Sequence, residues 1–209
     1  MNLGYFFDSE TTGIPNWKVP SENEEQPHLT QLGAILVDMD TKKEISSLDV
    51  VLKPNGWTIP DEVVALNGLT TDYCAEVGVP EDEAVRAFLM LGANIKRYAY
   101  NTTFDNRIIR IATKRYFPEK VQDDWKAGEY ECAMMAAKKD MGVRSVKLGD
   151  AYEHYFGERF KGAHDALSDT RAALRIWFAI QDAQESQSVL DISTKETPNP
   201  IPGDAGSGF

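Results

Sequence analysis

Hydrophobic residues in the first half of the chain gather in short runs that have the length of β-strands. Leu3 to Phe7, Thr30 to Met39 and Ile45 to Leu52 are rich in Leu, Ile, Val or Phe, and such runs are typical of buried strands. The last two are separated only by residues 40–43, so they are expected to pair antiparallel and to extend the sheet that the first run begins. A further strand is predicted from Ile95 to Tyr100.

Helical patterns begin after the third strand and dominate the rest of the chain. A short helix is predicted from Pro60 to Leu66, and another begins at Pro80, where residues 81–83 are acidic and complement the helix dipole. The other predicted elements are a helix from Thr102 or Thr103 to Tyr116, a short strand at Tyr130 to Ala133 leading into a helix to Met141, a helix from Lys147 to Phe156 and a long helix from Asp165 to about Gln184. This order indicates an α/β protein, a mixed sheet with helices packed on its faces.

Two segments have the composition of loops. Residues 14–28 contain three prolines and three glutamates, which is typical of an exposed and mobile loop. Residues 187–209 contain Pro198, Pro200 and Pro202 with several Gly and Ser, which is typical of a disordered tail. With 209 residues and 42% hydrophobic content, we predict one folded domain over residues 1–184 and a tail over 185–209.

The chain has none of the features expected of an exported or membrane protein. It does not begin with a charged segment followed by an apolar one, and it lacks an apolar run long enough to cross a bilayer. Cys74 and Cys132 have no metal-type spacing with each other or with the three histidines. Reduced thiols and a cytoplasmic location are therefore expected.

The net charge of −11 argues at first against a nucleic-acid partner, because phosphate contacts normally come from a basic surface. The charge is unevenly distributed, however, since residues 96–175 contain 16 Lys and Arg against 12 Asp and Glu. The basic residues of this segment could form a local positive rim. They are Arg107, Arg110, Lys114, Arg115, Lys138, Lys139, Arg144, Lys147, Arg159 and Lys161. The alternative, that they are solvated faces of helices, remains equally open.

The first strand runs directly into the sequence Asp8-Ser9-Glu10. Residues two apart in a strand point to the same side, so Asp8 and Glu10 can converge on one point. Two carboxylates held that close repel each other unless a cation lies between them. An isolated Asp-x-Glu pair is more often a solvated turn, so a metal site requires further ligands elsewhere in the chain.

Two further acids lie on apolar faces of predicted helices. Asp105 shares a face with Ile108 and Ile109, and Asp169 shares a face with Ala173. A carboxylate directed into a core must be paired or bind a cation, because desolvating it alone costs several kcal/mol. A structural ion pair with a nearby arginine, such as Arg107 or Arg171, is the alternative.

His164 lies five residues before Asp169 and directly after Gly162-Ala163. A histidine in a loop is usually only a surface residue. On a flexible segment near an inward carboxylate, however, it could take a proton from a water molecule held at a metal.

These pieces resemble the motifs of the DEDDh 3′-to-5′ exonucleases, a family that includes the proofreading epsilon subunit of bacterial DNA polymerase III, RNase T and oligoribonuclease. The matching segments are residues 7–13, 100–105 and 163–169, with weaker similarity at Gln31 to Ala34 and Asn67 to Thr70. The resemblance covers about residues 3 to 182. Each motif alone is weak, but four acids and a histidine in this order are a specific combination.

The resemblance implies an RNase H-like exonuclease fold, with a mixed five-stranded sheet and helices on both faces. It also implies that Asp8, Glu10, Asp105 and Asp169 hold two divalent ions, with His164 as general base. Ligation by oxygen alone favours Mg²⁺ or Mn²⁺ over zinc. Two such ions activate the attacking water and stabilise the leaving 3′ oxygen of the phosphodiester.

The same likeness suggests substrate contacts. Thr11, Thr12 and Leu69 would line the pocket of the terminal nucleotide, beside Gly13, and Asn101 and Phe104 would contact the penultimate one. Phe104 could equally be a core aromatic. Many relatives have His at the position of Tyr100, which puts that contact in question.

We therefore expect a metal-dependent 3′-to-5′ exonuclease that releases nucleoside monophosphates from DNA, with a proofreading role or a role in DNA repair or degradation. Two alternatives stay open: hydrolysis of RNA or short oligoribonucleotides, and a non-catalytic module that associates with a polymerase or a sliding clamp. Gln187 to Ile192 resembles the Gln-x-x-Leu-x-hydrophobic peptides that dock onto sliding clamps. A six-residue pattern of this kind also arises often by chance.

Overall fold

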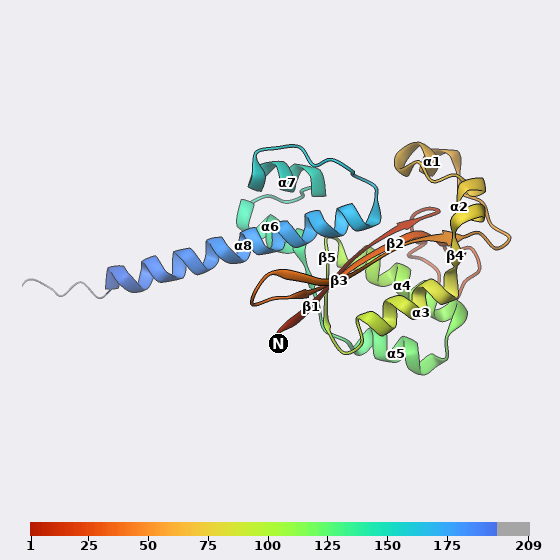
Figure 1. The fold of residues 1–209 in the computed structure, drawn as a ribbon, viewed down its shortest axis with the longest axis horizontal. Coiled ribbons are helices and arrows are strands. Elements are labelled where there is room, and N and C mark those ends of the chain that lie inside the picture. The colour runs from red at the N-terminus through yellow and green to blue at the C-terminus, as the bar shows by residue number, and fades with distance from the viewer. Residues whose placement is uncertain (196–209) are drawn as a thin grey trace, which may run out of the picture.

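A six-stranded mixed sheet forms the centre of the protein in a computed structural model, which describes residues 1–195 (Figure 1). Its strands lie in the order β4-β3-β2-β1-β5-β6. The strands β1, β2 and β3 form an antiparallel meander, and β5 and β6 continue the sheet parallel to β1. Their bounds are β1 Leu3–Thr11, β2 Leu29–Asp38, β3 Lys43–Lys53, β4 Val79–Pro80, β5 Lys96–Ala99 and β6 Tyr130–Cys132.

Helices cover both faces of the sheet. Figure 1 shows α6, α7 and α8 on one side, and α3, α4 and α5 on the other. Because side chains alternate along β1, Phe7 packs on Phe88 and Trp125 of the second layer, while Phe6 packs in the cluster that includes Leu174 of α8. The helices are α1 Asp61–Asn67, α2 Thr71–Val77, α3 Glu81–Leu91, α4 Thr102–Tyr116, α5 Glu119–Ala127, α6 Ala133–Met141, α7 Leu148–Phe156 and α8 Ala166–Lys195.

The mixed α/β architecture is confirmed, but the predicted number of five strands is wrong. The sixth strand is β4, two residues that pair parallel with the end of β3 at Leu52 and Lys53. Gly78 permits this approach, because a Cβ there would lie 2.6 Å from the backbone nitrogen of Lys53. A two-residue strand has no sequence period of its own, so only the tertiary contact defines it.

The loop over residues 14–28 was expected to be mobile, but many hydrogen bonds hold it. The amide of Gln26 donates to the carbonyl oxygens of Asn16 and Pro20 inside the loop. From α4, Arg107 donates to the carbonyl oxygen of Val19 at 2.7 Å, and Arg115 donates to that of Pro27 at 2.8 Å. The loop is therefore fastened along α4, which composition alone did not predict.

The last helix is longer than expected, since α8 extends to Lys195 instead of ending near Gln184. Gln187 to Ile192 therefore lies on a helical backbone, although the side chains from 189 onward lie outside the described part of the chain. Residues 196–209 also lie outside it. The division into a domain ending at residue 184 and a disordered tail stays a prediction, as does the contact with a sliding clamp.

Among residues 1–195, the structure contains no helix that combines the length and the apolar character needed to span a membrane.

Gly33 of β2 is where α8 comes closest to the sheet. It pairs with Asp8 of β1, and a Cβ at this position would lie 2.4 Å from the carbonyl carbon of Ala166 and 2.4 Å from the nitrogen of Leu167. The hydroxyl of Thr170 also donates to the carbonyl oxygen of Gly33 at 3.3 Å. A side chain at Gly33 would therefore push the first turn of α8 away from Asp8.

We expect Gly33→Ala to lower the free energy of unfolding by roughly 2 to 3 kcal/mol, because the new methyl group meets backbone atoms that cannot rotate away. Urea denaturation measures the effect. Gly149→Ala is the matched control, since Gly149 lies in α7 and a methyl group added there would meet nothing within 4 Å, and alanine at this position should stabilise the helix by up to about 1 kcal/mol. Equal stability of Gly33→Ala and the unmodified protein would contradict the close approach.

Candidate active site

Four acids from three elements meet at one cavity of about 320 Å³. Asp8 and Glu10 come from β1, the central strand next to β5, while Asp105 and Asp169 come from the first turns of α4 and α8. The two helices lie on opposite faces of the sheet, so the cavity forms where β1 ends between them. The other lining residues include Ser9, Thr11, Gly13, Ile14, Val63, Leu66, Tyr100, Asn101, Phe104, Leu148 and His164.

The end of β1 directs its side chains to both helical layers. Asp8 and Glu10 lie on the side of α8, whereas Ser9 points to the other side and donates a hydrogen bond of 2.7 Å from its hydroxyl to Oδ1 of Asp105. The pairing of β1 with β2 shifts register between Glu10 and Thr11. Such a bulge bends the strand and ends the regular pairing at the cavity.

Asp105 is 2% exposed. Burial raises the pKa of its carboxyl group to about 7, although the hydrogen bond from Ser9 opposes this rise. The helix α4 starts at this point because the carbonyl oxygen of Asn101 accepts hydrogen bonds from the backbone nitrogens of Phe104 and Asp105. The first turn of α4 thus fixes Asp105 in the cavity.

Asp169 is also buried, and burial raises the pKa of its carboxyl group to about 7. Its Oδ2 atom accepts a hydrogen bond from the backbone nitrogen of His164 at 3.3 Å. Its Oδ1 atom is buried without a hydrogen-bond partner. A buried, unpartnered carboxylate oxygen is the kind of atom that a cation would satisfy.

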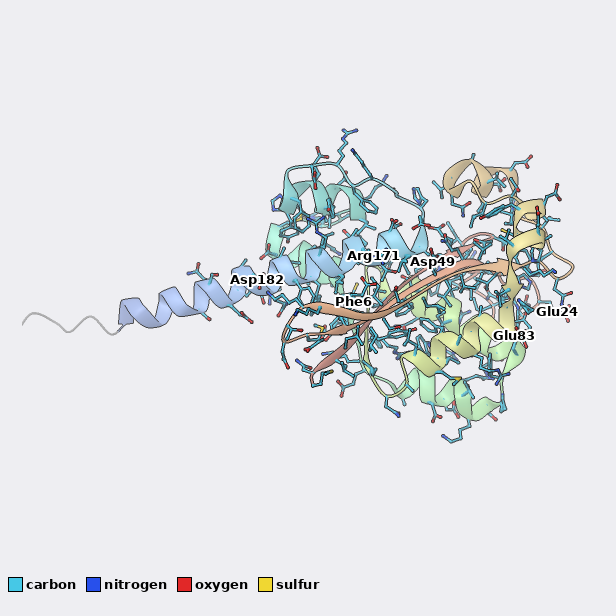
Figure 2. All side chains as sticks on the ribbon, in the orientation of Figure 1. Phe6, Glu24, Asp49, Glu83, Arg171 and Asp182 are labelled. Carbon is cyan, nitrogen blue, oxygen red and sulfur yellow. The ribbon has the colours of Figure 1, made fainter. Side chains whose placement is uncertain are left out.

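Gln31 of β2 fixes the start of α8. Its amide nitrogen donates to Oδ2 of Asp165 at 2.9 Å and to Oδ1 of Asp49 at 2.8 Å, while its amide oxygen accepts from the nitrogen of Ala166 at 3.2 Å. Figure 2 labels Asp49 on β3, close to the first turns of α8. Asp165 in turn caps the helix by accepting from the nitrogen of Ser168 at 2.9 Å. In the sequence, Gln31 belongs only to a weak motif match, because its role depends on contacts with residues that are far apart along the chain.

His164 reaches the cavity from an exposed loop. Its backbone has a φ of 67°, in the left-handed region, and follows Gly162 with a φ of 91°. A ring nitrogen of His164 and carboxylate oxygens of Glu10 and Asp169 lie within 4.8 Å of one another. The imidazole is thus close enough to act with these acids.

None of the four acids forms an ion pair with Lys or Arg among residues 1–188, whose side chains the structure describes. The arginines considered as ion-pair partners are used elsewhere, since Arg171 pairs with Glu44 at 3.1 Å and Arg107 donates to the loop. Burial, followed by repulsion from Asp105, Asp169 and Glu10, raises the pKa of Asp8 well above its ordinary value. Uncompensated negative charge around a buried carboxylate oxygen fits a divalent cation.

Glu10 has a different environment from the other three acids. Burial raises the pKa of its carboxyl group, and a hydrogen bond of 3.3 Å from the side chain of Asn67 opposes the rise. Asn67 is the last residue of α1, which also brings Val63 and Leu66 to the cavity. The spacing of Val63 and Leu66 on one helical face is the only sequence signal that could have identified this apolar wall.

The cavity includes four of the six predicted substrate contacts, Thr11, Gly13, Asn101 and Phe104. Thr12 and Leu69 are not among the lining residues. The backbone and hydroxyl of Thr12 instead pair with the backbone of His28, at 2.9 and 3.0 Å. Phe104 both lines the cavity and packs against the core, so the two interpretations of this side chain are compatible. The roles of all six residues stay predictions.

The sheet order, the two helical layers and the acid-lined cavity define a nuclease-type α/β domain, and the comparisons with known proteins agree. A family model described as an exonuclease, RNase_T, matches residues 5–177, so the chain belongs to this exonuclease family. The DEDDh exonuclease family and the RNase H-like fold inferred from the motifs are thereby confirmed. No curated protein sequence matches the chain at a significant level.

Several solved structures share the fold. Exonuclease I of E. coli in complex with a dT13 oligonucleotide is similar with a TM-score of 0.69 and 20% identity, covering 92% of this chain and 43% of that one. Exonuclease I from Methylocaldum szegediense has a TM-score of 0.72 and 20% identity, covering 88% and 41%. The nuclease domain of 3′hExo, a DEDDh family member bound to rAMP, has a TM-score of 0.66 and 14% identity, covering 88% and 92%. This chain thus spans about two fifths of the exonuclease I chains.

Proposed function

We propose that this protein is a metal-dependent 3′-to-5′ exonuclease that releases nucleoside monophosphates from single-stranded DNA, in proofreading or in DNA repair or degradation. The observation that carries the proposal is the convergence of four acids, which form no ion pair with a described Lys or Arg side chain: Asp8, Glu10, Asp105 and Asp169. A scaffold would gain nothing from burying these charges, which speaks against a purely non-catalytic interaction module.

The four acids would hold two divalent ions. When bound, such ions polarise the phosphoryl group, lower the pKa of a coordinated water and stabilise the leaving oxygen. The donor set consists of carboxylate oxygens, which favours Mg²⁺ or Mn²⁺. Exonuclease I of E. coli has been solved with bound zinc, so zinc belongs in any test of metal preference.

The side chains of this chain supply positioning and proton transfer. We assign His164 as the general base that removes a proton from the attacking water, because its ring lies beside Glu10 and Asp169. Ser9 holds Asp105, and Asn67 holds Glu10, in fixed orientations. A cavity of about 320 Å³ with an apolar wall from Val63 and Leu66 suits one terminal nucleotide, whose base packs on the wall while its phosphate faces the acids.

DNA is favoured as the substrate because similar exonuclease I structures contain DNA oligonucleotides, such as dT13 and dA16. RNA is the second candidate, and the observation that favours it is the rAMP bound to the nuclease domain of 3′hExo. To discriminate between DNA and RNA, the protein requires a contact with the 2′-hydroxyl group, which only RNA has.

The decisive experiment incubates 5′-labelled single- and double-stranded DNA and RNA with the protein in Mg²⁺, Mn²⁺, Zn²⁺ or chelator. We expect stepwise shortening of single-stranded DNA from its 3′ end, complete dependence on a divalent ion, and no shortening by Asp8→Ala. Failure to hydrolyse any of these substrates with any of the metals would refute the proposal. Shortening of RNA alone would replace DNA by the second candidate.

A further inference from the structure

The helix α4, which carries Asp105, also presents a row of cations on its outer side. Arg107, Arg110 and Lys114 are spaced by three and four residues, so they share one face of the helix. We call these three residues the α4 basic face. With a rise of 1.5 Å per residue, the row extends for about 10 Å along the helix. It begins one turn after Phe104, which lines the active-site cavity.

The α4 basic face forms no close ion pair with the described side chains of the protein, which are those of residues 1–188. Arg115 on the neighbouring side of the same helix differs, because it forms an ion pair with Glu81 at 3.8 Å. Burial and then the charge of Arg110 lower the pKa of Arg107, whereas the charge of Glu22 raises it. In a chain with a net charge of −11, three adjacent cations without an ion pair among the described side chains are a distinctive feature.

An exposed aromatic ring lies beside this row. Trp17 is 54% exposed, and the guanidinium group of Arg107 lies 5.8 Å from the centre of its ring. Trp17 belongs to the loop of residues 14–28, which starts at the cavity with Gly13 and Ile14 and is fastened to α4 through Arg107 and Val19. The ring is therefore held in place next to the cations instead of being buried.

An aromatic platform beside a line of cations is how proteins bind single-stranded nucleic acid: bases stack on the ring and phosphates follow the positive charges. We propose that Trp17 and the α4 basic face bind the nucleotides that lie 5′ of the penultimate one in a single-stranded DNA substrate. The strand would leave the cavity past Phe104, stack a base on Trp17 and place successive phosphates along Arg107, Arg110 and Lys114. This inference rests on the proposed function for the direction of the strand.

The test compares Arg110→Ala/Lys114→Ala, Trp17→Ala and a charge-matched control, Lys138→Ala/Lys139→Ala, on α6 in the opposite helical layer. Binding of 5′-fluorescein-labelled dT12 is measured by anisotropy in chelator at several salt concentrations, so that hydrolysis does not contribute. Arg110→Ala/Lys114→Ala should weaken binding and reduce the slope of log affinity against log salt by about 1.4, or 0.7 for each lost phosphate contact. Trp17→Ala should weaken binding about tenfold with the slope unchanged.

A second measurement uses turnover with Mg²⁺. Hydrolysis of the dinucleotide pdTpT should be the same in all variants, because it is too short to reach the α4 basic face. Hydrolysis of dT12 at low concentration should fall in Arg110→Ala/Lys114→Ala and in Trp17→Ala.

An equal loss of dT12 affinity in both double variants, an unchanged salt slope, or no binding of dT12 by the unmodified protein would overturn the proposal. Binding of an oligoribonucleotide but not of dT12 would overturn its assignment to DNA. Binding that depends on the α4 basic face, without any hydrolysis, would instead refute the proposed function and leave the binding surface standing.

Discussion

Asp105→Asn is expected to abolish nucleotide release and, at the same time, to stabilise the metal-free protein at neutral and alkaline pH. The amide has nearly the shape of the carboxyl group, and its oxygen can still accept the hydrogen bond from Ser9. It removes a buried charge that lies beside Asp8 and Asp169, however, and with it one ligand of the proposed metal site. Activity and stability should therefore change in opposite directions.

The pH dependence follows from the raised pKa of Asp105. Its value of about 7 in the folded protein exceeds the value of about 3.9 of an unfolded chain, so the folded state binds this proton more tightly. The native protein is thus penalised increasingly as pH rises from about 4 to about 7, and the penalty is complete above that range. Asn does not titrate, so the advantage of the variant should be absent near pH 4 and reach on the order of 2 to 4 kcal/mol above pH 7.

Urea denaturation in chelator at pH 4.5 and pH 8 measures the stability effect, and a single-turnover assay in Mg²⁺ measures activity. Asp123→Asn on the exposed side of α5 is the matched control, and it should change neither quantity. If Asp105→Asn were destabilised at pH 8, the carboxylate would have a favourable partner that the described structure does not contain.

His164→Ala is expected to reduce kcat by about 10² to 10⁴, the range of a lost general base, while the affinity for Mn²⁺ stays nearly unchanged. The imidazole lies near Glu10 and Asp169, which explains the expected loss of turnover. It comes from an exposed loop with a left-handed backbone, so its removal should not move the acids. The four acids, in contrast, are fixed on β1, α4 and α8. Rapid-quench kinetics at saturating DNA measures kcat, and calorimetry measures Mn²⁺ binding.

A loss of Mn²⁺ affinity comparable to that of Asp169→Ala would identify His164 as a metal ligand instead. His154→Ala provides the control, because this histidine lies on the exposed side of α7 and should affect neither measurement. Added imidazole should partly restore turnover in His164→Ala if the ring acts only in proton transfer.

The convergence of the acids could be predicted from the sequence because each acid breaks a local pattern. Asp8 and Glu10 share one side of a strand, and Asp105 and Asp169 occupy apolar faces of helices. The network of Gln31 could not be predicted, since it joins Asp49 and Asp165 across more than a hundred residues. Local composition also gave no indication that the 14–28 loop is fastened to α4, because its anchors are arginines of a distant segment.

The elements missed by the sequence analysis are short and bury little. The helix α2 has seven residues, of which only Cys74 is buried, so no period develops. The helix α5 buries only Gln122 and Trp125. The clearest local signals of both helices are at their N-termini. The hydroxyl of Thr70 accepts a hydrogen bond of 3.1 Å from the nitrogen of Tyr73 at the start of α2, and Pro118 directly precedes α5. Periodicity is a weak guide for helices of two turns.

The four acids meet where β1 ends, and this position has a consequence for the stability of the domain. Asp105 belongs to the helical layer on one face of the sheet and Asp169 to the layer on the other, and among the four acids only those of β1 lie between the two. Ions bound to all four acids would link the two helical layers. Metal binding should therefore slow hydrogen exchange in the first turns of both α4 and α8. Binding of the metal ions would then both prepare the site for catalysis and stabilise the packing of the two helical layers.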